Sequence, residues 1–128
     1  TDKMIKEFLL VGIGSFFGGG LRFLVSKWTQ TIDLLSLPLG TMTVNILGCF
    51  LIGFLSGLPV EGRFLTPQAK LLLTTGFCGG FTTFSTFMNE NDALLKDGNY
   101  LALSLYVGLS LALGFLAVVA GHQLAKAV

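Results

Sequence analysis

Four long stretches of this 128-residue chain carry almost no charge, and this pattern constrains the fold more than any other feature. A helix needs about 20 predominantly apolar residues to cross the hydrocarbon core of a bilayer. The pattern predicts four such helices, over about residues 4–28, 39–58, 67–95 and 99–126. We therefore predict an all-α integral membrane protein with a single transmembrane domain that covers residues 1–128.

The composition agrees with a membrane protein. Hydrophobic residues make up 52% of the chain and charged residues only 12%, whereas soluble domains have roughly 25% charged residues. A soluble domain this short keeps much of its surface in water and could not hide so many apolar side chains. The net charge is +1 and no basic stripe is present, so nucleic acid is not an expected partner.

The two cysteines and the N-terminal segment carry no strong signal. Cys49 and Cys78 both lie inside apolar stretches without zinc-type spacing, and we expect small core residues rather than a disulfide or a metal pair. The first apolar segment has no small-residue cleavage pattern, so we do not expect a cleavable signal peptide.

The charges that flank the predicted helices specify the orientation of the chain only weakly. With the N-terminus, the second loop and the C-terminus on one side, that side carries Lys3, Lys6, Arg63, Lys70 and Lys126, and the other carries Arg22, Lys27 and Lys96. Five positive charges against three give a weak bias under the positive-inside rule. Two interpretations stay open: a fixed orientation, or insertion in both orientations with pairing of inverted copies.

The third apolar segment contains a glycine pair in mid-membrane, Gly79-Gly80. Each glycine costs a helix about 1 kcal/mol relative to alanine. Hydroxyl residues follow directly, at Thr82, Thr83, Ser85 and Thr86. A broken helix is tolerated in a bilayer where protein buries it or where it lines a cavity, and such breaks coordinate ions. We therefore predict that the third helix is broken at Gly79-Gly80.

Other small residues recur at helical spacing. The pairs are Gly14 and Gly18, Ser15 and Gly19, Gly53 and Gly57, and Gly76 and Gly80. Small residues four apart allow transmembrane helices to approach closely, so these pairs predict tight helix packing.

Polar side chains line one face of two helices. Thr41 and Asn45 are four apart in the second helix, and Tyr106, Ser110 and Gly114 repeat this spacing in the fourth. Residues four apart share a helix face. A primary amide in the membrane must find partners or cost several kcal/mol. Two interpretations of Asn45 remain: a fastener between helices, or a donor that lines a polar path.

Phe84 and Phe87 are three residues apart and therefore share a face. Two phenylalanines in a membrane helix ordinarily contact the core or the lipid. Here hydroxyl residues flank both, so the ring edges could face a polar path. The edge of an aromatic ring is the positive end of its quadrupole and can approach an anion.

Three motifs together resemble the Fluc family of microbial fluoride channels, the CrcB-like proteins. They are GFCGGFTTFSTF at residues 76–87, GTMTVN at residues 40–45 and GGGLRF at residues 18–23. The resemblance covers essentially the whole chain. It implies an antiparallel, dual-topology homodimer in the cytoplasmic (inner) membrane. It also implies a channel rather than an enzyme, which exports fluoride passively and lowers fluoride toxicity in the cytoplasm.

The resemblance also assigns roles by position. It implies two fluoride pathways per dimer, formed by Asn45, Phe84, Phe87 and a polar track of Ser85, Thr86, Tyr106, Ser110 and Thr41. It implies a structural sodium ion held by the backbone carbonyls of Gly79 and Thr82, and vestibule or structural roles for Arg22 and Glu90. Met88 stands where many relatives carry a serine, and Gly114 stands where some carry a serine or another small residue, so both departures thin the expected polar track at one end.

Two other classes of protein fit less well. A small proton-coupled drug exporter also uses four short helices, but it needs a carboxylate embedded in the membrane, and no acidic residue lies in the middle of a predicted helix. A purely structural membrane protein would explain the small-residue pairs but not the run of polar residues after a costly glycine pair.

Overall fold

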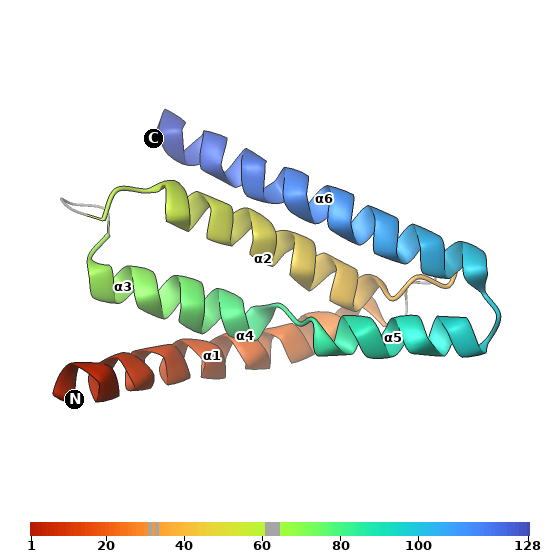
Figure 1. Cartoon of the computed structure of the whole chain (residues 1–128), viewed down its shortest axis with the longest axis horizontal. Coiled ribbons are helices and arrows are strands. Elements are labelled where there is room, and N and C mark those ends of the chain that lie inside the picture. Colours follow the sequence, from red (N-terminus) through yellow and green to blue (C-terminus); the bar gives the residue numbers. More distant parts are fainter. Residues whose placement is uncertain (31, 33, 61–64) are drawn as a thin grey trace.

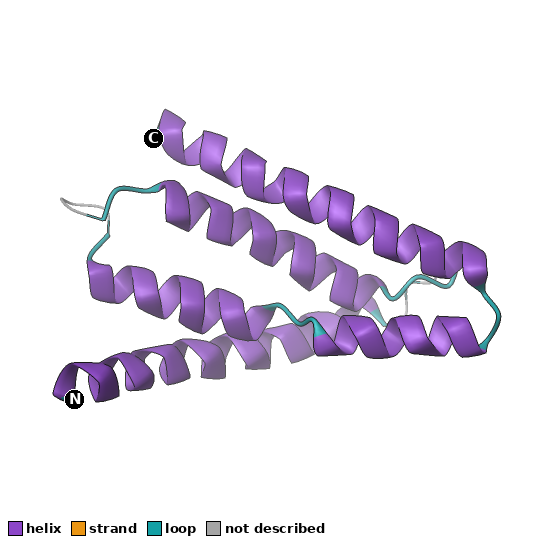
Figure 2. Cartoon of the chain, in the orientation of Figure 1, coloured by secondary structure: helices purple, strands orange, loops and turns teal. Residues whose placement is uncertain are grey.

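Four long helical segments lie side by side along one axis in the computed structural model of the chain, which describes residues 1–30, 32, 34–60 and 65–128 (Figure 1). Three are continuous helices: α1 (Asp2–Thr29), α2 (Leu39–Gly57) and α6 (Tyr100–Ala127). The other is built from the consecutive pieces α3 (Pro67–Leu71), η1 (Leu72–Cys78), α4 (Gly79–Phe81) and α5 (Ser85–Lys96). The part of the chain that the structure describes contains no strand (Figure 2).

The lengths of these segments suit a bilayer. Helices α1, α2 and α6 are each long and apolar enough to cross a membrane, and the third segment has a comparable extent in two parts (Figure 1). Both termini, the end of α2 and the start of α3 lie at one end of the bundle, the arrangement on which the count of flanking charges was based (Figure 1). Arg63, which entered that count, lies outside the described residues.

The ends of the third segment follow from local sequence. Thr66 precedes Pro67, and its hydroxyl accepts a hydrogen bond from the Ala69 amide at 3.1 Å, so a side-chain cap and an N-terminal proline begin the helix. At the other end, Gly98 adopts a φ of +72°, which glycine reaches without strain. The turn at this glycine makes α5 and α6 antiparallel neighbours.

The third segment is broken, but not at the predicted position. Gly79 has helical dihedral angles, and the helix continues through Gly80 to Phe81. The chain leaves the helix at Thr82, whose φ of −93° and ψ of 163° are extended, and regains it at Ser85. The predicted break at Gly79-Gly80 was therefore wrong, because intrinsic helix propensity does not decide this position. Tertiary contacts, described below, hold Gly80 against α1 and pair the backbone of Thr83 with Asn45 after the helix has ended.

Seven residues before the break form a π-helix, η1. In this piece the Thr74 hydroxyl donates to the Lys70 carbonyl at 2.7 Å. Such helices are rare and occur frequently at functional sites. Their presence here marks the centre of the third segment as the irregular part of an otherwise regular bundle.

Glycines allow α1 to pack directly on the backbone of the third segment. A Cβ atom added at Gly80 would lie 2.7 Å from the Ser15 carbonyl oxygen, and one added at Gly18 would lie 2.9 Å from the Phe81 amide nitrogen. Gly14 and Gly76 meet the facing backbone in the same way. The predicted small-residue pairs of these two segments are thus confirmed as contact points, and Gly80 serves packing rather than helix breaking.

A second glycine contact joins α2 to α6, where Gly53 meets the backbone of Val118 and Gly121 meets that of Phe50 and Phe54. Larger side chains pack together at the end of the bundle where α5 meets the first turns of α6. They form a buried cluster of Leu37, Met42, Phe87, Leu94, Ala102 and Tyr106. Because this cluster includes residues of α5 and α6, it fixes the segment that follows the break.

We predict that Gly18→Ala destabilises the protein by about 1–3 kcal/mol, because the added methyl group would overpack the contact with the third segment. The measurement is the free energy of unfolding in detergent micelles. Gly12→Ala is the matched control in the same helix, since no other part of this chain lies within 4 Å of its Cβ position. Equal stability of the two variants would contradict the packing role of Gly18.

Candidate functional site

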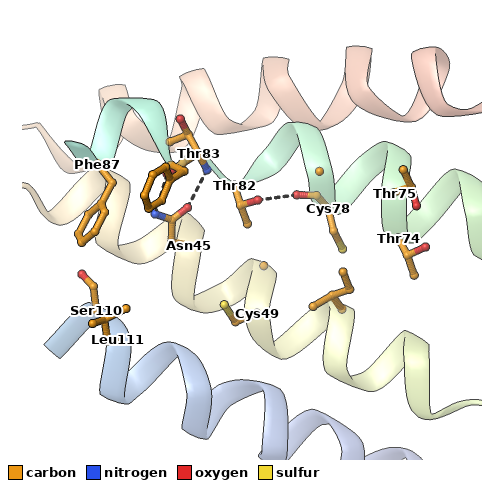
Figure 3. A pocket seen from close by; sticks show the side chains of 14 residues that line it. Asn45, Cys49, Thr74, Thr75, Cys78, Thr82, Thr83, Phe87, Ser110 and Leu111 are labelled. Atoms are coloured by element: carbon orange, nitrogen blue, oxygen red, sulfur yellow. Dashed lines mark hydrogen bonds between the residues drawn. The ribbon is translucent and has the colours of Figure 1, made fainter. Parts of the chain in front are cut away.

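The break lies beside a cleft of about 500 Å³ between α2, the third segment and α6 (Figure 3). The predicted site residues that line this cleft are Asn45, Gly79, Thr82, Phe84, Phe87 and Ser110. The cleft is therefore the place where residues from three segments, far apart in the sequence, come together.

A side-chain amide fixes the backbone at the break. The Asn45 Nδ2 group donates to the Thr83 carbonyl at 3.0 Å, and the Thr83 amide donates to Asn45 Oδ1 at 2.8 Å (Figure 3). Asn45 thus satisfies both backbone polar groups of one non-helical residue, which in a membrane have no water to bond. The fastener interpretation of Asn45 is correct in this structure, and its place in the cleft wall is equally compatible with the polar path.

Two carbonyl groups at the break lose their helical donors. In a continuous α-helix the Thr83 amide would bond to the carbonyl of Gly79, and the Thr86 amide to that of Thr82. Here the Thr83 amide donates to Asn45 and the Thr86 amide donates to the Thr83 hydroxyl at 3.3 Å. The carbonyls of Gly79 and Thr82 therefore lose their helical donors. Both residues line the cleft, so both carbonyls are candidates to bind a ligand.

The hydroxyl residues after the break form a small cluster around Thr83. Its hydroxyl donates to Thr86 Oγ1 at 3.1 Å and lies 3.5 Å from Ser85 Oγ. Ser85 and Thr86 themselves are not among the residues that line the cleft. In this conformation they support the first turn of α5.

The two phenylalanines differ in their surroundings. Phe87 is buried, whereas Phe84 is 73% exposed on the surface of the chain. Their ring centroids are 6.3 Å apart with a tilt of 48°. Phe87 also meets the Tyr106 ring at 4.9 Å in an edge-to-face arrangement. The pair thus connects the open side of the cleft with the buried interior.

Tyr106 is completely buried and makes a specific polar contact. Its hydroxyl donates to Glu90 Oε1 at 2.7 Å. Thr41 is also buried. None of these three residues lines the cleft. The Tyr106 ring packs against Phe87, which does line it. The hydrogen bond between Tyr106 and Glu90 was not predicted from the sequence.

Arg22 contacts the third segment directly before the break. Its Nε group donates to the Gly80 carbonyl at 2.9 Å, and Ser15 Oγ on the same helix donates to the Gly76 carbonyl at 3.1 Å. Both side chains supply donors to backbone oxygens of the irregular region. Of the two roles expected for Arg22, this contact is the structural one.

Ser110 presents a hydroxyl with spare hydrogen-bonding capacity to the cleft. Its Oγ atom is buried and has no hydrogen-bond partner among the described residues. A buried polar atom without a partner is costly and uncommon in native proteins. An available donor at this position is what a polar ligand in the cleft would require.

Several residues of the cleft were not assigned to the site from sequence. They include Cys49, Thr74, Thr75, Cys78 and Thr83. Thr83 belongs to the run of hydroxyl residues that follows the glycine pair, and only its pairing with Asn45 distinguishes it from the other members of that run. Cys78 is buried as expected of a small core residue, but both cysteines also contribute to the cleft wall.

A bundle of apolar helices, one of them interrupted beside a cleft, is the architecture of a multi-pass membrane protein. The family model described as "CrcB-like protein, Camphor Resistance (CrcB)" matches residues 9–122. The chain therefore belongs to the CrcB-like family, which confirms the resemblance seen in its motifs.

Curated relatives agree over almost the whole length. A protein of Chlorobaculum tepidum is 50% identical over 123 residues, which cover 96% of this chain and 97% of the relative. A protein of Chlorobium phaeobacteroides (strain DSM 266) is 47% identical over 124 residues, with 97% and 95% covered. Both relatives are named "Fluoride-specific ion channel FluC". A channel is not an enzyme, in agreement with the predicted absence of catalysis.

We predict that Asn45→Ala lowers the free energy of unfolding in detergent by about 1–3 kcal/mol, because the amide and carbonyl of Thr83 lose their partners. Thr43→Ala is the control: Thr43 lies two residues away in α2, and among the described residues its side chain forms no recorded hydrogen bond. If both variants unfolded alike, the pairing of Asn45 with Thr83 would not be what stabilises the break.

Proposed function

We propose that this chain forms a fluoride-selective channel that passively exports fluoride across the cytoplasmic membrane and so limits fluoride toxicity. The observation that carries the proposal is the near full-length similarity to proteins named fluoride-specific ion channels. The hydrogen-bond donors that Asn45 and Ser110 place at the cleft supply a physical basis for it.

Fluoride is small and strongly hydrated, so it enters a membrane protein only where donors replace its water. The Ser110 hydroxyl has no hydrogen-bond partner in the part of the chain that the structure describes. The Asn45 amide has two N–H groups, and one donor to Thr83 leaves the other for an anion. The edges of Phe84 and Phe87 add a weak positive potential without a full charge that would trap the ion. Such moderate binding suits conduction.

The proposed assembly is an antiparallel homodimer with two pathways. Phe84 is largely exposed, and no other described segment of the chain comes within 4 Å of a Cβ position at Gly79. Both residues belong to the cleft, so its open side is the natural place for a second copy. The weak charge bias of the loops is compatible with insertion in both orientations.

A structural sodium ion is proposed at the same place, held by the carbonyls of Gly79 and Thr82. The fit rests on the diversion of the amides of Thr83 and Thr86, which removes the helical donors from both oxygens. Carbonyl oxygens suit a hard cation. When bound, the ion would supply a positive charge that joins the two subunits.

The direction of transport follows from the membrane potential. An anion that leaves a negative-inside cell gains about 2.3 kcal/mol per 100 mV. Weakly acidic hydrogen fluoride enters the cell, dissociates, and leaves fluoride to accumulate. A passive channel is therefore sufficient to remove it.

The direct test of the proposed function is an efflux assay. Liposomes that contain the purified protein and are loaded with potassium fluoride should release fluoride when a potassium ionophore is added. Liposomes loaded with potassium chloride should retain chloride under the same conditions. Equal release of both anions would refute selectivity, and retention of both would refute the channel.

A second test addresses the rings. Phe84→Ile and Phe87→Ile should each slow fluoride efflux by about tenfold or more, because isoleucine lacks the positive ring edge. A tenfold change in rate corresponds to about 1.4 kcal/mol in barrier height. Phe81→Ile is the matched control, since Phe81 stacks on Phe77 and does not line the cleft. Wild-type rates in the first two variants would remove these rings from the pathway.

A further inference from the structure

On α6, the position one helical turn after Ser110 has no polar side chain. Ser110 presents a buried hydroxyl without a partner. Four residues further along the same face stands Gly114, which is buried and has no side chain to offer. An anion that leaves Ser110 in this direction would find no donor on α6 at the next level.

A thiol from another helix occupies the missing place. A Cβ atom built on Gly114 would have one neighbour within 4 Å, the Sγ atom of Cys49, at 3.4 Å. Cys49 lies in α2, four residues after Asn45 and therefore on the same helix face. Figure 3 shows Cys49 and Ser110 at the same cleft, which both residues line.

The register between α2 and the third segment agrees with this position. Asn45 pairs with Thr83, and a Cβ atom at Gly48 would meet the Thr82 side chain. Because the two segments run antiparallel, Cys49 lies one helical turn from Asn45 in the direction of η1. The thiol therefore lies on the η1 side of the break, where Thr74 and Thr75 of the third segment also line the cleft and the Thr74 hydroxyl donates to the Lys70 carbonyl.

We propose that the Cys49 thiol is the hydrogen-bond donor of the anion pathway at the level of Gly114. This inference rests on the proposed function and assigns a further residue to it. A thiol is a weak S–H donor, which allows a small anion to pass without being held. Cys49 thus extends to the next turn the sequence of donors formed by Asn45 and Ser110, and α2 supplies the polar atom that α6 lacks.

The test is a donor exchange between the two helices, read out as fluoride efflux from liposomes. Cys49→Ala should slow efflux about threefold to fivefold, the change expected for loss of one hydrogen bond. Cys49→Ser should retain the rate, because it retains a donor. Cys49→Ala/Gly114→Ser should restore the rate, because the new hydroxyl occupies the space that the thiol leaves.

Cys49→Ala/Gly114→Ala is the matched control, since it fills the same volume without a donor and should remain slow. Recovery of the rate in this control would show that Cys49 acts by packing alone and would overturn the proposal. Unchanged efflux in Cys49→Ala would overturn it as well. Even if Cys49→Ala failed to fold, the two double variants would still separate a donor from a filler.

Thiol modification gives a second readout. In a Cys78→Ala background, a small neutral methanethiosulfonate should modify Cys49 and reduce fluoride efflux, with modification confirmed by mass spectrometry. Full efflux after complete modification would contradict the assignment. Failure of the wild-type protein to conduct fluoride would refute the proposed function itself, whereas a conducting wild type with an indifferent Cys49 would refute this inference alone.

Discussion

The pairing of Asn45 with Thr83 is the interaction on which the rest of the site depends. A backbone that leaves its helix inside a bilayer must find other partners for its polar groups, because neither lipid nor bulk water supplies them there. Asn45 satisfies the amide and the carbonyl of Thr83 with one side chain. As a result the backbone polar groups of the break are satisfied and the Gly79 carbonyl loses its helical donor, while the Thr83 hydroxyl takes the Thr86 amide from the Thr82 carbonyl.

Close packing by glycine supports this arrangement from the other side. Gly18 and Gly80 bring α1 against the backbone of the third segment, where Arg22 donates to a carbonyl directly before the break. The irregular region is therefore held between α1 and α2. The same piece of backbone serves the assembly of the bundle and lines the cleft at the break.

The approximate positions of the helices could be predicted from the sequence, because the length of an uncharged apolar stretch is a local property and the thickness of the bilayer sets the length that a spanning helix needs. The small-residue pairs of α1 and the third segment likewise predicted contacts that the structure contains. The position of the break could not be predicted from propensity, since it depends on Asn45, which is 38 residues away from Thr83. The role of Thr83 was missed for the same reason, because nothing local separates it from the neighbouring threonine. The place of Cys49 opposite Gly114 required the register of two helices.

Hydrogen exchange of the Thr83 amide, measured by NMR on the protein in micelles, tests the central claim most directly. The account predicts that this amide is protected although it lies outside any helix, and that Asn45→Ala removes the protection while the amides within α2 and α6 remain protected. Rapid exchange at Thr83 in the wild type, or protection that survives Asn45→Ala, would contradict the role of Asn45 in holding the break.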